Sequence, residues 1–139
     1  MDQRMYLPTL SELIDRLSVT QIKLNLANND PKDFQNEIKK INNDIDLIMR
    51  EKKLQLDSEF VNLILVIAQL NLHIWHNKDL MQQNLDNEDQ YLALLKKAHQ
   101  LNGYRNQIKN RILDIEGIED KSQIRSNFET DGLNINLGL

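Results

Sequence analysis

The chain has 139 residues and a formal net charge of −4; 40% of its residues are hydrophobic and 27% are charged. This length suits one domain with a single hydrophobic core. The acidic balance argues against a general nucleic-acid binder, which needs a basic surface. The chain contains no cysteine, which excludes disulfides, thiolate catalysis and Cys-ligated zinc.

Glycine and proline are scarce, at four and two residues, and this scarcity favours long helices over turn-rich sheets. The N-terminal sequence MDQRMYLP has no apolar segment of the kind found in signal peptides, so we expect a cytoplasmic protein. The predicted fold is all-α: a four-helix up-down-up-down antiparallel bundle over residues 1–117. An irregular C-terminal tail is expected over residues 118–139.

The first two predicted helices have recognisable starts. Residues 9–12, Thr-Leu-Ser-Glu, match a capping box that opens a helix, and residues 28–29, Asn-Asn, end it. The Asp-Pro pair at 30–31 places an N-cap before a proline in the first turn of the second helix, which ends near residues 54–56. Its apolar stripe is narrow, so we expect it to be the most exposed helix and a candidate oligomer surface.

The third predicted helix contains the most apolar stretch, residues 60–75. Its apolar residues cover every side of a helix, and such a helix is expected to be buried on all sides. Asn62, Gln69, Asn71 and His73 interrupt the stretch before about 18 clean apolar residues accumulate. The sequence therefore predicts the central helix of a bundle and no membrane span.

The last two helices are bounded by polar caps. Asp57 or Ser58 is expected to start the third helix, which runs to about residue 85. After a break at residues 86–87, the fourth helix carries apolar residues at spacings of three and four, with Arg105 among them. Gly117 is the expected C-cap.

Antiparallel neighbours joined by short turns place residues at one level when their numbers sum to a constant. With turns near 29, 56 and 86, Asn71 should face position 101 of the fourth helix and position 41 of the second. One predicted polar level contains Asp15, Asn71, Asn102 and Arg105, with Glu12 and Asn106 close by. A second level contains Lys23, Trp75, His76 and Asp79, and His99 lies between the two.

Arg105 is the most informative polar residue because a buried guanidinium needs partners. Asp15 or Glu12 could pair with it, and Asn71 and Asn102 could accept from its remaining donors. Three interpretations stay open. The level is a structural layer that fixes bundle register; or it is a pocket where Arg105 holds a phosphate or carboxylate beside acids acting as base or metal ligands; or Arg105 is solvated.

The histidines are candidate metal ligands because His73, His76 and Asp79 follow each other at spacings of three. Metal-binding bundles use Glu-x-x-His pairs from two helices, and no such pair occurs in the sequence. We therefore predict neither a metal site nor a cofactor. Trp75 is expected to anchor the core through its apolar ring; stacking on a sugar or base is the alternative.

Three short segments resemble one recurrent bacterial pattern. Residues 10–24, LSELIDRLSVTQIKL, resemble an E-L-x-D-[KR]-L opening, and residues 68–79, AQLNLHIWHNKD, resemble an L-N-x-x-[IL]-W-x-x-E-D segment. Residues 98–112, AHQLNGYRNQIKNRI, resemble a closing N-x-x-R-N segment. The pattern is that of small all-helical bacterial domains of unknown function, often associated with cell-envelope glycan or lipopolysaccharide genes.

This resemblance implies a binding set, because the shared motif positions are polar. Lys78 departs from the pattern by replacing an acid, which reverses the local charge and puts any activity of such a site in doubt. The ligand-binding residues implied by level and resemblance together are Glu12, Asp15, Lys23, Asn71, Trp75, His76, Asp79, Asn102, Arg105 and Asn106.

The sequence thus predicts a small binding or accessory protein with a polar pocket around Arg105 for an anionic or sugar-bearing ligand, linked by resemblance to envelope glycan synthesis. One alternative is a structural or assembly protein, bacterial or viral, that oligomerises through the second helix or the tail. Another is an enzyme that uses Glu12 and Asp15 with Arg105.

Overall fold

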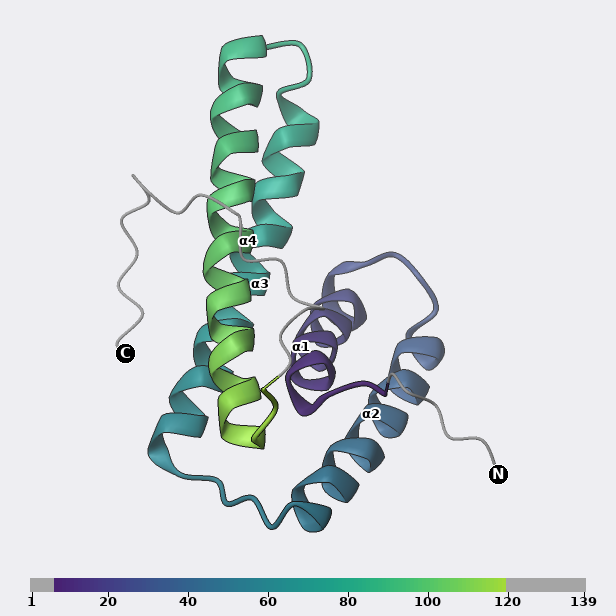
Figure 1. Ribbon diagram of the computed structural model, residues 1–139. Helices are drawn as coiled ribbons and strands as arrows, with labels where there is room; N and C mark the ends of the chain where they lie inside the picture. The colour runs from purple at the N-terminus through teal and green to yellow at the C-terminus, as the bar shows by residue number, and fades with distance from the viewer. Residues whose placement is uncertain (1–6, 120–139) are drawn as a thin grey trace.

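The computed structural model describes residues 7–119, which form four α-helices and no strand. The helices are α1 (Leu10–Leu26), α2 (Pro31–Glu51), α3 (Ser58–Gln83) and α4 (Glu88–Glu116), and they alternate in direction along the chain (Figure 1). The all-α four-helix prediction is confirmed. Of the predicted tail, residues 118–119 follow α4 without helical structure, and residues 120–139 lie outside the described residues.

Side-chain caps set the helix starts where the sequence placed them. Each N-cap side chain accepts a hydrogen bond from a backbone N–H in the first turn, which satisfies a donor that the helix leaves free. At the other end of α4, Gly117 adopts a left-handed conformation with φ of +83°, which a residue with a Cβ adopts only with strain. The N-caps are Thr9, Asp30, Asp57 and Asn87.

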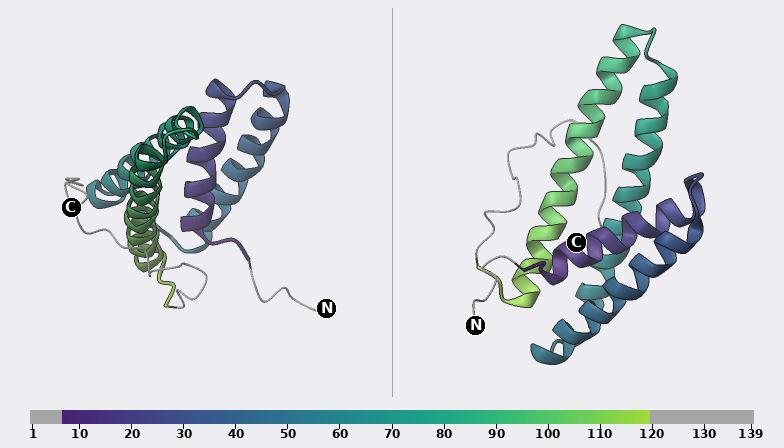
Figure 2. Two further views of the ribbon diagram at one scale, coloured as in Figure 1. Left: turned by 90° about the horizontal axis from the view of Figure 1, so that it is seen from above. Right: turned by 90° about the vertical axis from the view of Figure 1, so that its right-hand side faces the viewer.

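The helices pair as two antiparallel hairpins, α1 with α2 and α3 with α4. The α1–α2 hairpin lies to one side of the α3–α4 hairpin and is inclined to it (Figures 1 and 2). Helix α1 packs on α2, α3 and α4, whereas no Cα atom of α2 lies within 8 Å of a Cα atom of α3 or α4. The expectation that position 41 faces Asn71 is therefore wrong. The apolar stripe of α2 is narrow, with only Ile41 buried, and it packs against a single helix, α1.

The core lies where α1 crosses α3 and α4. It is made of aliphatic side chains and one phenylalanine, and α2 adds only partly buried residues such as Ile45, Ile48 and Met49. Burial of such side chains stabilises the fold by about 1.5–3 kcal/mol each. The buried core residues are Leu10, Ile14, Phe60, Leu63, Val66, Ile67, Leu70, Ile74, Leu101, Ile108 and Ile112.

Helix α3 is buried on one face only, so the prediction that residues 60–75 are buried on all sides is wrong. Val61, Leu65 and Leu72 are 39%, 55% and 40% exposed. Of the four described helices, only α1 and α4 pack on α3, and two neighbouring helices cannot cover a whole helix. By length and composition α3 could cross a membrane, and 33% of its most apolar window is buried inside the fold.

Glu116, at the end of α4, contacts both the start of α1 and the segment after α2. Its Oε1 accepts a hydrogen bond of 2.6 Å from the backbone N–H of Leu10, the first residue of α1. Its Oε2 lies 2.6 Å from Nζ of Lys52, just after α2, and the carboxylate-bearing side chain is 4% exposed. A carboxylate at a helix N-terminus is favoured by the partial positive charge there.

The one-sided burial of α3 predicts a sharp contrast between two leucines. Leu63 is 0% exposed and Leu65 is 55% exposed. Leu63→Ala should lower the free energy of unfolding by about 2–5 kcal/mol because it leaves a core cavity, whereas Leu65→Ala should change it by about 0.5 kcal/mol. Urea unfolding in dilute solution, followed by circular dichroism, measures both. Equal losses would contradict the described packing of α3.

Candidate functional site

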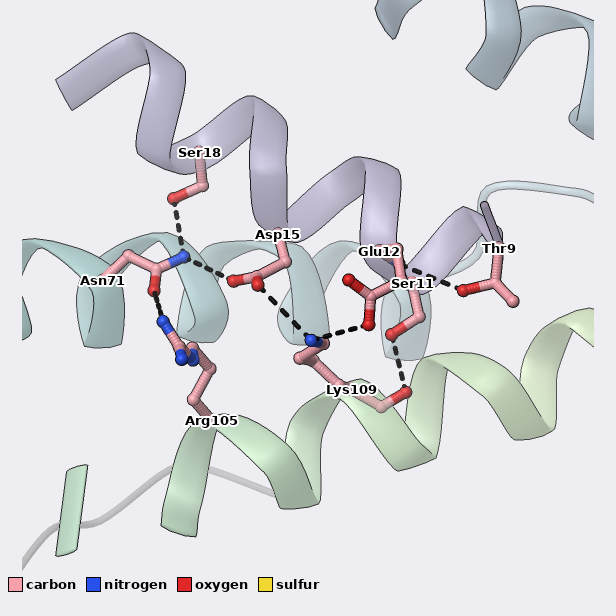
Figure 3. Close-up of polar contacts among 8 residues, drawn as sticks. All are labelled: Thr9, Ser11, Glu12, Asp15, Ser18, Asn71, Arg105 and Lys109. Carbon is pink, nitrogen blue, oxygen red and sulfur yellow. Dashed lines mark hydrogen bonds and ion pairs between the residues drawn. The ribbon is translucent and has the colours of Figure 1, made fainter. Parts of the chain in front are cut away.

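A polar layer lies where α1 crosses α3 and α4, and Asn71 makes contacts to both of the other helices in it (Figure 3). The Asn71 side chain comes from α3 and is buried, with 3% exposure. Its Nδ2 donates to Oδ1 of Asp15 at 2.9 Å and to Oγ of Ser18 at 3.3 Å. Its Oδ1 accepts from Nη1 of Arg105 at 3.4 Å. One amide thus connects α1, α3 and α4, and we call these residues, together with Ser11, Glu12 and Lys109, the Asn71 layer.

Lys109, one turn after Arg105 on α4, takes the two carboxylates of the layer. Its Nζ lies 2.8 Å from Oε1 of Glu12 and 3.5 Å from Oδ2 of Asp15. Its backbone carbonyl accepts a hydrogen bond of 2.8 Å from Oγ of Ser11. The expectation that Glu12 or Asp15 pairs with Arg105 is therefore wrong. Matching levels by residue number is accurate only to about one helical turn, and Lys109 lies one turn after Arg105 on α4.

Among residues 7–119, no carboxylate forms an ion pair with Arg105. Its guanidinium, which carries five N–H donors, donates one long hydrogen bond to Asn71. Its Nε is buried and has no hydrogen-bond partner among residues 7–119. A buried N–H that is unpaired costs about 1–3 kcal/mol. The arrangement leaves donors on Arg105 that an anionic group could engage.

The other predicted site residues divide into two groups. Asn102 turns back on its own helix, where its Nδ2 donates to the carbonyl of Ala98 at 2.9 Å, and Asn106 is buried on α4. No hydrogen bond or ion pair between described residues joins the second predicted level to the Asn71 layer. Of that level, Trp75 is half-buried, and Lys23, His76 and Asp79 are exposed.

Three residues of the layer were missed from the sequence: Ser11, Ser18 and Lys109. The signal for them was present. Ser11, Asp15 and Ser18 follow one another at spacings of four and three, which places them on one side of α1. Lys109 follows Arg105 by four residues and thus lies on the same side of α4. Polar residues repeated at these spacings among apolar ones are the signal that indicates Ser11 and Ser18 on α1 and Lys109 on α4.

A surface pocket of about 540 Å³ adjoins the layer on the outer side of α1. This volume falls within the range of small-molecule sites. Glu12 and Asp15 contribute to both the pocket wall and the layer, whereas Arg105 is connected to the pocket through Asp15 and Asn71. The lining residues are Leu7, Pro8, Glu12, Leu13, Asp15, Arg16 and Val19.

The described residues contain no cluster of three or more His, Asp or Glu side chains arranged to hold a metal ion. Comparisons of the chain with family models, with curated proteins and with solved structures found no match. The resemblance to small bacterial helical domains thus stays a prediction that depends on its three short motifs.

The Lys109 contacts predict a stability effect that an exposed lysine lacks. Lys109→Met keeps the apolar stem but removes the cation, which leaves Glu12 and Asp15 without the positive charge that neutralises them. We expect the free energy of unfolding to fall by roughly 2 kcal/mol, less than for a fully buried pair because Glu12 is partly exposed. Lys97→Met, on an exposed position of the same helix, is the matched control in urea unfolding. Similar values for both variants would refute the pairing.

Proposed function

We propose that this protein is a small binding or accessory protein whose ligand places an anionic group on Arg105. The observation that carries the proposal is the lack of a carboxylate beside this guanidinium within residues 7–119, together with the unpaired, buried Nε. A phosphate or carboxylate supplies the acceptors that Arg105 lacks.

Two cations in the layer differ in what they can still bind. The charge of Lys109 is neutralised by Glu12 and Asp15. Among the described residues, the hydrogen-bond partner of Arg105 is the neutral amide oxygen of Asn71. A guanidinium binds a carboxylate or phosphate through two parallel hydrogen bonds, which an ammonium cannot do. This supports Arg105 as the anion-binding residue and Lys109 as the residue that holds the acids in place.

The pocket on α1 supports a ligand with hydroxyl groups. The carboxylates of Glu12 and Asp15 are hydrogen-bond acceptors, and Leu13 and Val19 supply apolar wall. Sites for small molecules combine apolar walls with a few placed polar groups. A sugar phosphate or sugar nucleotide carries both hydroxyl groups for these carboxylates and an anionic group for Arg105. The proposed link of this protein to envelope glycan synthesis depends on the sequence resemblance alone.

A structural role is the second candidate, and one observation favours it. Asn71 is hydrogen-bonded to α1 and α4 at once, as expected of a layer that only fixes how helices pack. The enzyme alternative needs Glu12 or Asp15 free as an acid or base. Both contact Lys109, so one carboxylate must first leave that cation.

Thermal unfolding with a ligand panel tests the proposal. The panel contains inorganic phosphate, sugar phosphates and sugar nucleotides. A ligand present at 100 times its Kd should stabilise the wild-type chain by about 2.7 kcal/mol, which appears as a rise in Tm. Arg105→Ala should abolish that rise. Arg111→Ala removes an exposed arginine of the same helix and should retain it.

Two results would count against binding at Arg105. One is the absence of a Tm rise with every member of the panel. The other is a rise that persists in Arg105→Ala. If Asn71→Ala lowers the Tm strongly while no ligand raises it, the structural candidate is preferred.

A further inference from the structure

The pocket on the outer side of α1 has charges of both signs on its wall. Glu12 and Arg16 both line it, and their spacing of four residues places them on one side of the helix. A glutamate four residues before an arginine is the favoured order for an ion pair along a helix. Among residues 7–119, however, Glu12 and Arg16 form no ion pair with each other.

Each of these two side chains contacts a different neighbouring helix instead. Glu12 turns toward α4, where its Oε1 lies 2.8 Å from Nζ of Lys109 (Figure 3). Nε of Arg16 donates to Oε1 of Glu37, on α2, at 2.7 Å. Helix α1 packs on both α2 and α4. The carboxylate and the guanidinium that share the pocket are thus held toward different neighbours and do not neutralise each other.

Both charged groups remain accessible to a ligand. The side chains of Glu12 and Arg16 are 37% and 68% exposed. Ion pairs at such exposed positions are weak, so a ligand carboxylate can replace Glu37 on Arg16 at small cost. Asp15, the other acid of the pocket wall, is 13% exposed and already contacts Asn71 and Lys109. Glu12 is therefore the acid of this wall that is best placed to bind a cation.

The rest of the pocket wall is apolar, and it is formed by Leu7, Pro8, Leu13 and Val19. Leu7 is 63% exposed, and covering such a side chain with an apolar group favours binding. The volume of about 540 Å³ lies in the lower half of the range of small-molecule sites, about 300–1,000 Å³. The pocket therefore suits a small ligand with an apolar part.

The three features of the wall together define a class of ligand. Glu12 suits a cation, Arg16 suits a carboxylate bound through parallel hydrogen bonds, and the apolar wall suits a hydrocarbon group. An α-amino acid carries an ammonium group, a carboxylate and a side chain on one carbon atom. We propose that this pocket binds a free α-amino acid with an apolar side chain, its ammonium group on Glu12 and its carboxylate on Arg16.

This inference goes beyond the proposed function and does not depend on it. Arg105 does not line the pocket, and the amino acid needs only Glu12 and Arg16. A sugar group of a ligand on Arg105 would use the same carboxylates of the pocket wall, so the two ligands should compete. Glu37 is then an internal competitor of the amino acid, since it occupies Arg16 in the unliganded chain.

Isothermal titration calorimetry of the full chain with L-leucine, L-isoleucine and L-phenylalanine tests the site. Arg16→Gln and Glu12→Gln should each raise the Kd at least about tenfold, because each removes a charge-assisted contact. Arg111→Gln, at an exposed position of α4, is the matched control for Arg16 and should leave the Kd unchanged. Arg105→Ala should also retain binding, which separates this site from the proposed anion site. Circular dichroism confirms that each variant is folded.

A gain of affinity is expected when the internal competitor is weakened. Glu37→Gln keeps the length of the side chain and removes its charge, so it should lower the Kd by up to about fivefold, as expected for a weak surface pair. Glu51→Gln, at an exposed position of the same helix, is the matched control. Because Arg16→Gln removes the group for which Glu37 competes, adding Glu37→Gln to that variant should change nothing further.

Ligand analogues test which groups the pocket recognises. N-acetyl-L-leucine lacks the ammonium group and L-leucinamide lacks the carboxylate, so both should bind at least about tenfold more weakly than L-leucine. The proposal is overturned if no apolar amino acid binds, if Arg16→Gln leaves the Kd unchanged, or if either analogue binds as tightly as L-leucine. A sugar phosphate that binds through Arg105 while no amino acid binds would refute this inference alone.

Discussion

The fold depends on the packing of α1 against each of the other three helices. Helix α2 approaches the rest of the described chain closely only through α1, and α3 and α4 would otherwise be a bare antiparallel hairpin. A two-helix hairpin cannot enclose a core of its own. Leu10 and Ile14 of α1 are buried in the same cluster as Leu63 of α3 and Ile108 of α4. The short first helix, rather than the long apolar one, is therefore the centre of the domain.

The polar groups buried at this crossing limit how α1 can sit. Apolar contacts are tolerant of sliding by a turn, because a leucine finds similar surroundings one turn away. The contacts of Asn71 with Asp15 and of Lys109 with Glu12 are not, because a shift would leave charged and amide groups buried without partners. Specific polar pairing thus fixes the position of α1 along α3 and α4, and the apolar core stabilises it. The same layer leaves Nε of Arg105 without a hydrogen-bond partner.

Local signals in the sequence predicted the helices well, because caps act over three or four residues. The capping side chains of Thr9, Asp30 and Asp57 and the left-handed Gly117 could all be read from composition and spacing. Level matching also brought Asp15, Asn71 and Arg105 together correctly. It could not separate Arg105 from Lys109, since one turn of error decides which cation meets a carboxylate.

Tertiary arrangement was harder to predict, because it depends on which faces meet. An evenly apolar helix predicts burial on all sides. The structure buries Leu63 and leaves Leu65 exposed two residues later, since α2 packs on α1 and on neither of the other two described helices. Sequence periodicity shows that a surface prefers contact, but not whether the contact comes from the same chain.

The tie made by Glu116 has a consequence for how this domain can be joined to others. Its carboxylate accepts a hydrogen bond from the first residue of α1. The start of α1 and the end of α4 therefore lie side by side. Domains with adjacent ends tolerate circular permutation and can be inserted into a loop of a host protein without separating the host's flanking strands or helices. This four-helix unit therefore has the geometry of an insertable module, with its entry and exit fastened by a single side chain.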